Sequence, residues 1–370
     1  MNQERYLRHS LIDWFYQDQL SKSKILVIGA GAIGNELIKN LALLGVGNFH
    51  IVDYDKIEVH NLTRSVLFNE SHIGHYKSEI AAMVAKQLNP NINASFDVED
   101  LWKTISIKDI KKYSAVFCCV DNFEARLRLN RLCYIAKTDY YNSGIDSRYV
   151  NVEYFPYAVI NNCTCYECNI PTSIYSKARE RYSCGWLKKV SFEEKKIPTT
   201  IITASIAASQ LISLFLQRKH SSCYQSPVKV FTDTITLQSN VVQQPKNDLC
   251  YCCSSIDDNV IYINAKRESD YLQNLQISII EDFEIELSDP IILNSVCKVC
   301  GDEIVYNDIA ANYDDSITVC EKCRVHSREV NIVDIVSYDS FSSLMKNKNL
   351  AVKFIKVNFG VNQFIIELED

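Results

Sequence analysis

Residues Lys24–Asp55 read KILVIGAGAIGNELIKNLALLGVGNFHIVDYD, and this stretch decides the fold class. An apolar run leads into Gly29-x-Gly31-x-x-Gly34, a helical pattern follows, and a second apolar run ends at Asp53. The first glycine allows a tight turn, the second lets backbone N–H groups approach a phosphate, and the third lets helix and strand pack closely. The helix N-terminus favours an anion, and Asp53 stands where a carboxylate can bind ribose hydroxyls. The pattern predicts a nucleotide site and leaves both NAD and ATP open.

The sequence around this stretch alternates between strand-like and helix-like segments. Residues 2–20 resemble a short amphipathic lead-in helix. We expect strands at Phe49–Val52, Ala94–Val98, Ala115–Val120, Tyr140–Asn142 and Tyr149–Phe155, and helices at Gly34–Leu44, Lys77–Leu88 and Asn122–Thr138. Such alternation predicts an α/β, Rossmann-like, doubly wound and mainly parallel sheet. Ligands of this fold bind at the carboxyl ends of the strands.

The character of the sequence changes after about Ser255. Beyond it, β-like segments surround a cysteine-rich middle, at Val260–Ile263, Gln276–Ile280, Glu284–Leu287 and Phe354–Glu369. We therefore predict two domains: residues 1–255, which hold the nucleotide site, and residues 256–370, a small β-rich domain of zinc-ribbon type.

Composition narrows the classes of function. A net charge of −6 and a pI near 5.7 argue against nucleic-acid binding, which usually needs a basic face. The uncharged stretch Ile197–Gln217 is interrupted by Thr, Ser and Gln, so we interpret it as a buried helix and not as a membrane span. No secretory pattern is visible, and 15 cysteines then indicate metal sites and reactive thiols in a reducing compartment. We expect a cytoplasmic protein.

A second constellation favours ATP over NAD. Asn61-Leu62-Thr63-Arg64 and Lys77 follow the glycine turn, and Asp121 stands just before a later helix that carries Arg126. Near the start of the chain stands Arg8 in Arg-Tyr-Leu-Arg. Several basic groups and a second acid suit a triphosphate, because Lys and Arg neutralise phosphates and Asp can hold a bridging Mg²⁺.

From about Arg5 to Cys253, these motifs together closely resemble the ThiF/MoeB/HesA superfamily, which includes the ubiquitin-activating enzymes. The resemblance implies adenylation of a protein or peptide carboxylate with ATP and Mg²⁺ as cofactors. It assigns Asp53 to the ribose, Asp121 to Mg²⁺, and Arg8 to the ATP of a neighbouring subunit in a homodimer. The remaining candidates of the nucleotide site are Gly29, Gly31, Gly34, Asp55, Asn61, Arg64 and Lys77.

The chain departs from the family pattern at a few positions. His9 and Ser65 replace glutamines that usually follow the two arginines, and Ala32-Ile33 replaces Gly-Leu in the turn. Ordinary alternatives also exist for the site residues. Arg64 and Lys77 would be surface charges, Asp121 a helix N-cap, and Arg8 a solvated helix residue.

The cysteines fall into two candidate zinc sites and a remainder. Zinc prefers four thiolates, and each Cys-x-x-Cys offers two from one tight turn. The resemblance joins Cys165, Cys168, Cys250 and Cys253 in one site, with Cys163 and Cys252 as competing ligands. The closer spacing C-x2-C-x19-C-x2-C predicts a second site at Cys297, Cys300, Cys320 and Cys323, with His326 as an alternative to the last. Four others, in apolar contexts, indicate core packing: Cys118, Cys119, Cys133 and Cys223.

Cys184 differs from the other cysteines because it lies among Arg and Lys residues that favour a thiolate. The resemblance offers it a role as thioester-forming nucleophile in a crossover loop, and the alternative is an unreactive loop cysteine. The substrate is left open between a ubiquitin-like protein, a sulfur carrier of thiamine or molybdenum cofactor synthesis, and a precursor peptide of a modified natural product. An NAD-dependent oxidoreductase and a non-catalytic activating-enzyme-like scaffold are the other classes.

Overall fold

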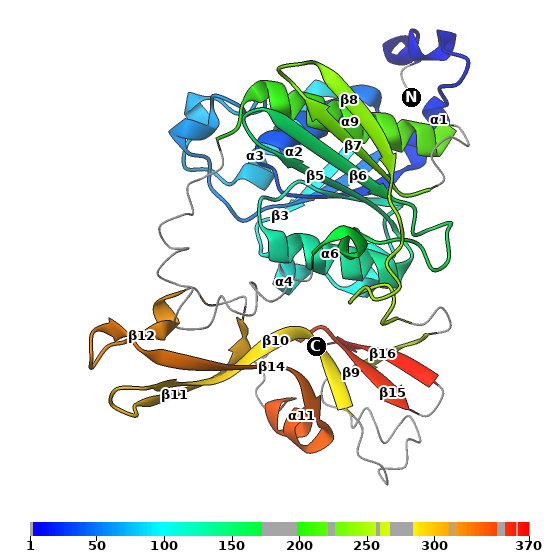
Figure 1. The fold of residues 1–370 in the computed structure, drawn as a ribbon. Helices are drawn as coiled ribbons and strands as arrows, with labels where there is room; N and C mark the ends of the chain where they lie inside the picture. The colour runs from blue at the N-terminus through cyan, green and yellow to red at the C-terminus, as the bar shows by residue number, and fades with distance from the viewer. Residues whose placement is uncertain are drawn as a thin grey trace. The chain divides into compact units, whose positions relative to one another are not determined.

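The computed structural model describes residues 3–171, 198–220, 226–256, 260–266, 284–310, 313, 315–345, 352–359 and 362–369. The chain forms two compact units (Figure 1). The first takes in Met1–Asn169 and Ile197–Ser255, and the second includes Ile256–Asp370. The strand expected at Gln276–Ile280 lies outside the described residues.

An eight-stranded sheet organises the first unit. Its order is β3-β2-β1-β4-β5-β6-β7-β8, and its first five strands are parallel, whereas the last three pair antiparallel. The strands are β1 (Lys24–Ile28), β2 (Asn48–Val52), β3 (Asn93–Asp97), β4 (Ala115–Cys118), β5 (Asp139–Ile145), β6 (Tyr149–Phe155), β7 (Val228–Asp233) and β8 (Gln238–Gln243). The chain leaves β1 towards β2 and later returns on its other side as β4, so the switch point for a ligand lies at the carboxyl ends of β1 and β4.

Helices cover both faces of this sheet (Figure 1). On one face α2 (Ala32–Leu44) packs against α3 (Lys77–Leu88) and α9 (Ile201–His220), and on the other lie α4 (Leu101–Thr104), α5 (Ile107–Ile110) and α6 (Phe123–Ala136). Local chemistry fixes their ends: Gly45 closes α2 in the left-handed conformation, and the Asn122 side chain caps α6 by accepting from Ala125 N–H. The predicted Rossmann-like class is confirmed.

Helix α9 belongs to the core of this unit. By length and composition alone it is the one helix among the described residues that passes as a candidate membrane span. Its small and apolar side chains Ala204, Ala207, Leu211 and Phe215 are fully buried. Ala207, Leu211 and Phe215 belong to the same hydrophobic cluster as residues of the strands, which is the packing of a core helix.

The N-terminal segment differs from the single lead-in helix that we expected. It forms two short 3₁₀ turns, Gln3–Tyr6 and His9–Leu11, followed by α1 (Gln17–Lys22). Tyr6 and Phe15 are buried and anchor the segment on the domain, so tertiary packing overrides the helical pattern. We call residues 3–16 the N-terminal arm.

The second unit is a six-stranded sheet with a small hairpin beside it. The order is β11-β10-β15-β16-β9, with β14 also paired to β10, and β12 pairs with β13. The strands are β9 (Ile261–Lys266), β10 (Glu284–Cys297), β11 (Glu303–Ile309), β12 (Val319–Cys320), β13 (Val325–His326), β14 (Arg328–Ser337), β15 (Phe354–Phe359) and β16 (Asn362–Glu369). Helix α11 (Tyr338–Met345) packs on β14 and β10 and contributes Phe341 and Leu344 to a separate core. The expectation of a β-rich C-terminal region is confirmed.

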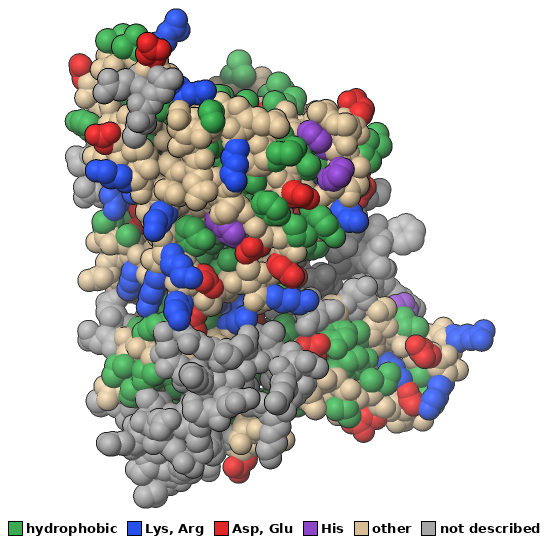
Figure 2. Space-filling view, turned by 180° about the vertical axis from the view of Figure 1, so that it is seen from behind, with side chains coloured by type: hydrophobic (Ala, Val, Ile, Leu, Met, Phe, Trp, Pro, Cys, Tyr) green, Lys and Arg blue, Asp and Glu red, His purple; other side chains and the backbone are tan. Residues whose placement is uncertain are grey.

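Acidic and basic side chains are interspersed over the face that Figure 2 shows, in keeping with the modest net charge of −6.

Candidate functional site

The glycine turn lies at the switch point, between β1 and α2. Gly29 has φ +93°, and a Cβ there would lie 2.8 Å from the Cys119 carbonyl oxygen. A Cβ on Gly34 would lie 1.9 Å from the Gly29 carbonyl oxygen, so helix and turn are in direct contact. A Cβ on Gly31 would meet nothing within 4 Å. The turn is therefore tightly packed beneath and open above Gly31, as phosphate binding through backbone N–H groups requires.

Asp53 faces the glycine turn from the end of β2. Its carboxylate accepts hydrogen bonds from Ala30 N–H at 2.6 Å and from Asp55 N–H at 2.8 Å. Burial raises the pKa of this carboxyl, although the Ala30 bond and the positive charge of Lys77 oppose the shift. The acid that the sequence assigns to the ribose is thus preorganised against the phosphate turn.

Lys77 and Asp55 form an ion pair next to this acid. The Lys77 ammonium lies 2.7 Å from the Asp55 carboxylate, and Lys77 N–H also donates to the Asp55 carbonyl at 2.9 Å. Ser78 Oγ, one residue on, donates to the Asp53 carbonyl at 2.7 Å. The start of α3 is therefore tied to the end of β2, and both charged candidates stand at the same edge of the sheet.

Arg64 and Asn61 lie in the loop that links β2 to α3. Asn61 is buried, and its side chain accepts from Glu58 N–H at 3.0 Å, which closes a short 3₁₀ turn. Arg64 is half-buried, and its guanidinium donates to the His60 carbonyl at 2.9 Å. In this conformation both side chains stabilise their own loop.

Asp121 is exposed and lies three residues after the end of β4. It is not the helix cap, because Asn122 fills that role, so the N-cap alternative is wrong. Within the described part of the chain, its carboxylate has no hydrogen-bond or ion-pair partner. Burial raises the pKa of the nearby Tyr54 hydroxyl, and so do the surrounding carboxylates of Asp55, Asp100, Asp53 and Asp121. Asp121 and Asp53 thus approach the same region from β4 and β2.

Arg8 lies at the opposite end of the domain. Its neighbours anchor the N-terminal arm at the C-terminal ends of α2 and α3: Tyr6 packs on Gly45, and its hydroxyl accepts from Asn89 Nδ2 at 2.7 Å. Helix α2 has 13 residues and is therefore about 20 Å long. Because the glycine turn stands at the other end of α2, the structure does not bring Arg8 together with the other candidates of its own chain.

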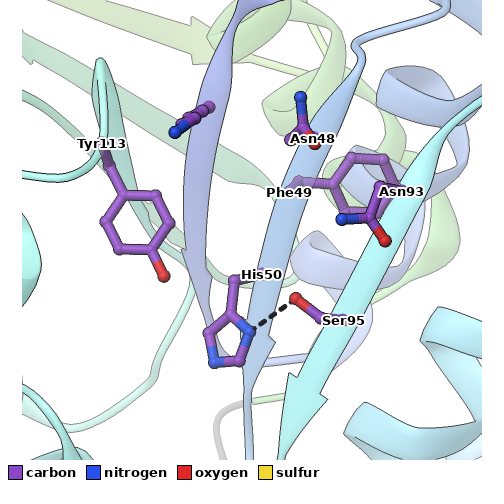
Figure 3. A pocket seen from close by; sticks show the side chains of 7 residues that line it. Asn48, Phe49, His50, Asn93, Ser95 and Tyr113 are labelled. Carbon is purple, nitrogen blue, oxygen red and sulfur yellow. Dashed lines mark hydrogen bonds between the residues drawn. The ribbon is translucent and has the colours of Figure 1, made fainter.

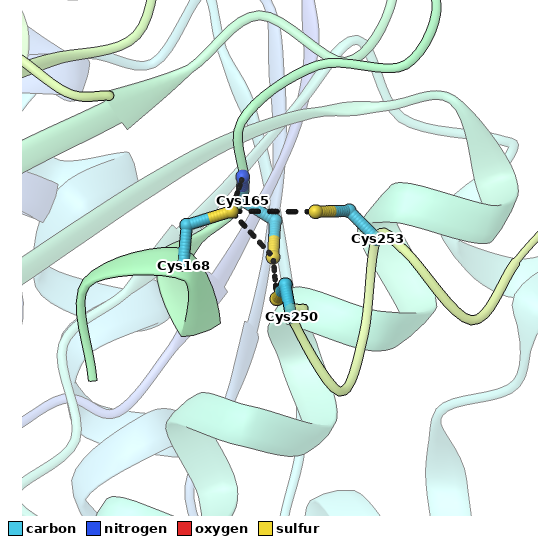
Figure 4. Close-up of side chains that lie close together, drawn as sticks. All are labelled: Cys165, Cys168, Cys250 and Cys253. Atoms are coloured by element: carbon cyan, nitrogen blue, oxygen red, sulfur yellow. Dashed lines mark hydrogen bonds between the residues drawn. The ribbon is translucent and has the colours of Figure 1, made fainter. Parts of the chain in front are cut away.

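The first cysteine cluster unites two knuckles that are far apart in the sequence. Cys165 and Cys168 meet Cys250 and Cys253, with all four sulfur atoms within 4.8 Å of one another (Figure 4). Sulfur pairs stand 3.5 Å, 3.3 Å and 4.0 Å apart. Tetrahedral Zn–S bonds of about 2.3 Å place sulfur atoms about 3.8 Å apart, so these residues fit a zinc ion. Cys163 and Cys252 are buried outside this set.

The second cluster lies in the C-terminal unit, where Cys297 and Cys300 meet Cys320 and Cys323. Sulfur pairs are 3.9 Å and 3.7 Å apart, which also fits zinc. His326 instead pairs with the Thr318 hydroxyl at 2.9 Å, and the set of four sulfurs does not include it.

The remaining cysteines divide as the structure allows. Cys118, Cys119 and Cys133 are buried in the first unit, as expected for core residues. No described cysteine forms a disulfide. Cys184 and Cys223 lie outside the described residues.

A shallow depression of about 240 Å³ lies at the other end of the strands (Figure 3). Lys24, Asn48 and Asn93, the first residues of β1, β2 and β3, contribute to its lining. His50 bridges Ser95 at 2.8 Å and Asp97 at 3.1 Å across β2 and β3. The depression is at the amino ends of the parallel strands and is separate from the glycine turn.

Three polar residues support these sites, and none of them was assigned a role from the sequence, although Arg126 belongs to the constellation that carries the family resemblance. Buried Asn35 donates to the Ala30 carbonyl at 3.1 Å and accepts from Leu67 N–H at 2.7 Å, so it joins the glycine turn to the loop of Arg64. Glu167, inside the first cysteine knuckle, binds Arg131 of α6 at 3.1 Å. Arg126, also on α6, donates to the Val120 carbonyl at 2.5 Å. The only signal for Asn35 in the sequence is a polar residue on an otherwise apolar helix face.

Comparison with known proteins agrees with this architecture. The SUMO-activating enzyme subunit uba-2 of Caenorhabditis elegans is 36% identical over 152 residues, which are 41% of this chain and 26% of that protein. The adenylyltransferase and sulfurtransferase MOCS3 of Arabidopsis thaliana is 29% identical over 182 residues, which are 48% of this chain and 39% of that protein. The chain thus spans well under half of these relatives' length.

A solved structure and a family model extend the match to most of the first unit. E. coli MccB, crystallised with AMPCPP and MccA, shares the fold with a TM-score of 0.56 at 23% identity, over 68% of this chain and 75% of that one. The model of the ThiF family matches residues 4–252, about two-thirds of the chain. The chain belongs to the ThiF family.

Proposed function

We propose that this protein is an ATP- and Mg²⁺-dependent adenylyltransferase that activates the carboxylate of a protein or peptide. The observation that carries the proposal is the convergence of three groups at the carboxyl ends of the strands. These are the open backbone at Gly31, the Lys77–Asp55 pair and the unpartnered carboxylate of Asp121. A nicotinamide dinucleotide needs no such combination of a lysine and a second acid.

In the proposed reaction a substrate carboxylate oxygen attacks the α-phosphorus of ATP. The bond from the α-phosphorus to the bridging oxygen breaks, and the products are an acyl-adenylate and pyrophosphate. Asp53 would orient the ribose, the glycine turn would hold a phosphate, and Lys77 and Arg64 would exchange their present partners for phosphate oxygens. These residues act by positioning and by neutralising charge. Mg²⁺ held by Asp121 would supply further charge neutralisation across the phosphates.

The relatives support a protein or peptide as the substrate class. The SUMO-activating subunit is named for a ubiquitin-like protein, MOCS3 for sulfur transfer, and MccB was crystallised with MccA. We favour a ubiquitin-like protein or a precursor peptide over a sulfur carrier because residues 256–370 add a second cysteine-clustered unit beyond the family match. That unit is our candidate for partner docking. None of the cysteines that the structure describes forms a disulfide. Together with the proposed use of ATP, this supports a cytoplasmic location.

A homodimer is part of this proposal. Arg8 is exposed, has no partner in the described part of the chain, and stands about one helix length from its own glycine turn. Leu7, Leu11 and Trp14 beside it are 62%, 76% and 52% exposed. Large apolar side chains next to an unused arginine suit burial against a second copy, in which Arg8 would reach the partner's ATP.

The substitution Asp121→Ala tests the proposed reaction. It removes an exposed carboxylate and no core packing, so the fold should persist while ATP–pyrophosphate exchange with the cognate carboxylate is lost. A loss below about tenfold would correspond to less than about 1.4 kcal/mol, which is too little for an essential metal ligand. Asp18→Ala, an exposed acid in α1, is the control and should leave exchange unchanged.

The acyl acceptor is tested separately at Cys184. If Cys184 forms a thioester, Cys184→Ala should preserve pyrophosphate exchange and eliminate a covalent adduct that thiol reductants cleave. If the wild-type protein forms no such adduct with its substrate, the adenylate passes directly to an amine, a sulfur donor or a nucleophile within the peptide. That result would favour the sulfur-carrier or peptide-modifying alternative, whereas absence of any exchange would favour the non-catalytic scaffold.

A further inference from the structure

The loop that presents Asp121 is held by hydrogen bonds from a single guanidinium. Arg126 Nη2 donates to the carbonyl of Val120, the residue just before Asp121, at 2.5 Å. Its Nη1 donates to Asn142 Oδ1 and to the Ser143 carbonyl, both at 2.6 Å. Arg126 therefore connects the end of β4 to the middle of β5, and each of its contacts is charge-assisted and short.

The partners of Arg126 are themselves fixed within the sheet. Asn142 is buried, and its Nδ2 donates to Glu153 of β6 at 2.8 Å. Glu153 is also buried and pairs with Lys229 of β7 at 3.7 Å. A polar chain thus runs across three strands and ends at the peptide that carries Asp121. A rigid sheet supports such a chain better than a loop could support itself.

On the other side of Asp121 the chain is fixed as well. Asn122 caps α6 by accepting from Ala125 N–H at 3.1 Å. Asp121 is the residue between these two attachments, and it alone projects an unpartnered carboxylate among the described groups of this loop. The loop is therefore held on both sides of Asp121, and the two carboxylate oxygens of Asp121 are left available to bind a metal.

We infer that Arg126 is a positioning residue that sets the Asp121 carboxylate for the metal of the nucleotide site. The inference rests on the proposed function, because it requires Asp121 to bind Mg²⁺. In this inference Arg126 acts on Asp121 through the Val120 carbonyl and does not itself serve as a ligand of nucleotide or metal. Residues that orient a metal ligand in this manner typically change metal affinity about 10–100-fold when they are replaced.

The test measures the ATP affinity of the full-length protein in the presence of Mg²⁺ and in the presence of a chelator. The affinity with Mg²⁺ divided by the affinity with chelator is the Mg²⁺ ratio. In wild type, Mg²⁺ should tighten ATP binding. Arg126→Lys cannot make all three bonds, so it should lower this ratio about tenfold while the chelator value stays within about twofold. Asn142→Ser removes one of the three Arg126 bonds, together with the Asn142–Glu153 bond. It should give a smaller loss, which keeps the test open if Arg126→Lys folds poorly.

Two further variants separate positioning from stability. Arg218→Lys disturbs another arginine attached to β5, because Arg218 binds Asp139 at 3.1 Å at the start of that strand. It should leave the Mg²⁺ ratio unchanged. Asp121→Asn should lower the ratio as strongly as Arg126→Lys does, and the double variant should lose no more than Asp121→Asn alone, because the two residues act on one contact.

The outcomes distinguish the inference from the function on which it rests. If Asp121→Asn keeps the Mg²⁺ ratio, Asp121 is not the metal ligand and the proposed function loses its metal site. If Asp121→Asn lowers the ratio of ATP affinities with and without Mg²⁺ and Arg126→Lys leaves it at the wild-type value, only the positioning role of Arg126 is overturned. Additive losses in the double variant, or an equal loss in Arg218→Lys, would overturn it too.

Discussion

Gly31 and Gly34, three residues apart in the turn, differ in the space around them. One glycine is therefore needed for packing and the other for ligand binding. A Cβ on Gly34 would lie 1.9 Å from a backbone oxygen, whereas a Cβ on Gly31 would meet no atom within 4 Å. Backbone cannot move aside as a side chain can, so Gly34→Ala must displace helix or turn. The methyl group of Gly31→Ala would instead occupy the open space that we assign to a phosphate.

We therefore predict that Gly34→Ala lowers the free energy of unfolding by about 1–3 kcal/mol, the range for overpacking, and that its unfolding temperature falls clearly. Gly31→Ala should unfold at nearly the wild-type temperature and bind ATP at least about tenfold more weakly, because a phosphate loses its backbone contacts. Thermal unfolding and ATP titration of both variants check this pair. Normal ATP affinity in Gly31→Ala would place the phosphates elsewhere.

The residues expected to contact the nucleotide are easier to predict from the sequence than the residues that hold these contact residues in place. Glycine spacing and the acid after β2 follow from local chemistry, so Gly29, Gly34 and Asp53 were visible. Asn35 and Arg126 were not assigned a supporting role, because each also binds partners far away in sequence. Leu67 lies 32 residues from Asn35, and Asn142 and Ser143 lie 16–17 residues from Arg126. No short-range pattern specifies such contacts.

Among the elements, α6 links the proposed metal loop to the first cysteine cluster. The helix begins just after Asp121, and its Asn130 and Arg131 bind buried Glu167 inside the Cys165–Cys168 knuckle. The second cluster has an equivalent support, since Arg328 of β14 pairs with Asp302 beside Cys300. Each cysteine cluster therefore joins distant segments within its own unit, which is the role of a structural zinc site.

The protein should bind two zinc ions per chain, and each should stabilise one unit. Removing a thiolate leaves three ligands and weakens the tetrahedral site, so Cys297→Ser should destabilise mainly the second unit and Cys165→Ser the first. Metal analysis gives the stoichiometry, and hydrogen exchange locates the loss of protection. One zinc or none would remove at least one site, and uniform loss in both variants would contradict a separate role for each cluster in its own unit.

Element boundaries were predictable where burial follows one local period. The expected helix Lys77–Leu88 has the bounds of α3, and the strand Tyr149–Phe155 has those of β6. The N-terminal arm was predicted wrongly as one helix because its apolar residues do not serve a helix face. Tyr6 and Phe15 are buried against the domain, whereas Leu7 and Leu11 remain exposed, and such a division depends on tertiary contacts.

The N-terminal arm displays large apolar side chains at the surface, although it is anchored on the first unit. Arg5 of the arm donates to the Leu88 carbonyl at 2.9 Å, and Gln17, which directly follows the arm, donates to the Leu44 carbonyl at 2.8 Å. An anchored segment that displays Leu11 at 76% exposure beside Arg8 has the character of an interface. A symmetric contact between two copies would bury both arms and exchange both arginines.

We predict that the protein is a homodimer in solution and that each active site takes Arg8 from the partner. Arg8→Ala and Asp121→Ala should each abolish pyrophosphate exchange as pure proteins, since each lacks one group at both sites. In a mixed dimer one site has neither group and the other has both, so subunit exchange should restore about half of the wild-type activity per heterodimer. Mass measurement of the mixture confirms that heterodimers form, and Asp18→Ala mixed with Asp121→Ala provides the reference for one intact type of subunit. If heterodimers form and activity does not return, Arg8 does not act across the interface, whereas a monomeric wild type would remove the shared site altogether.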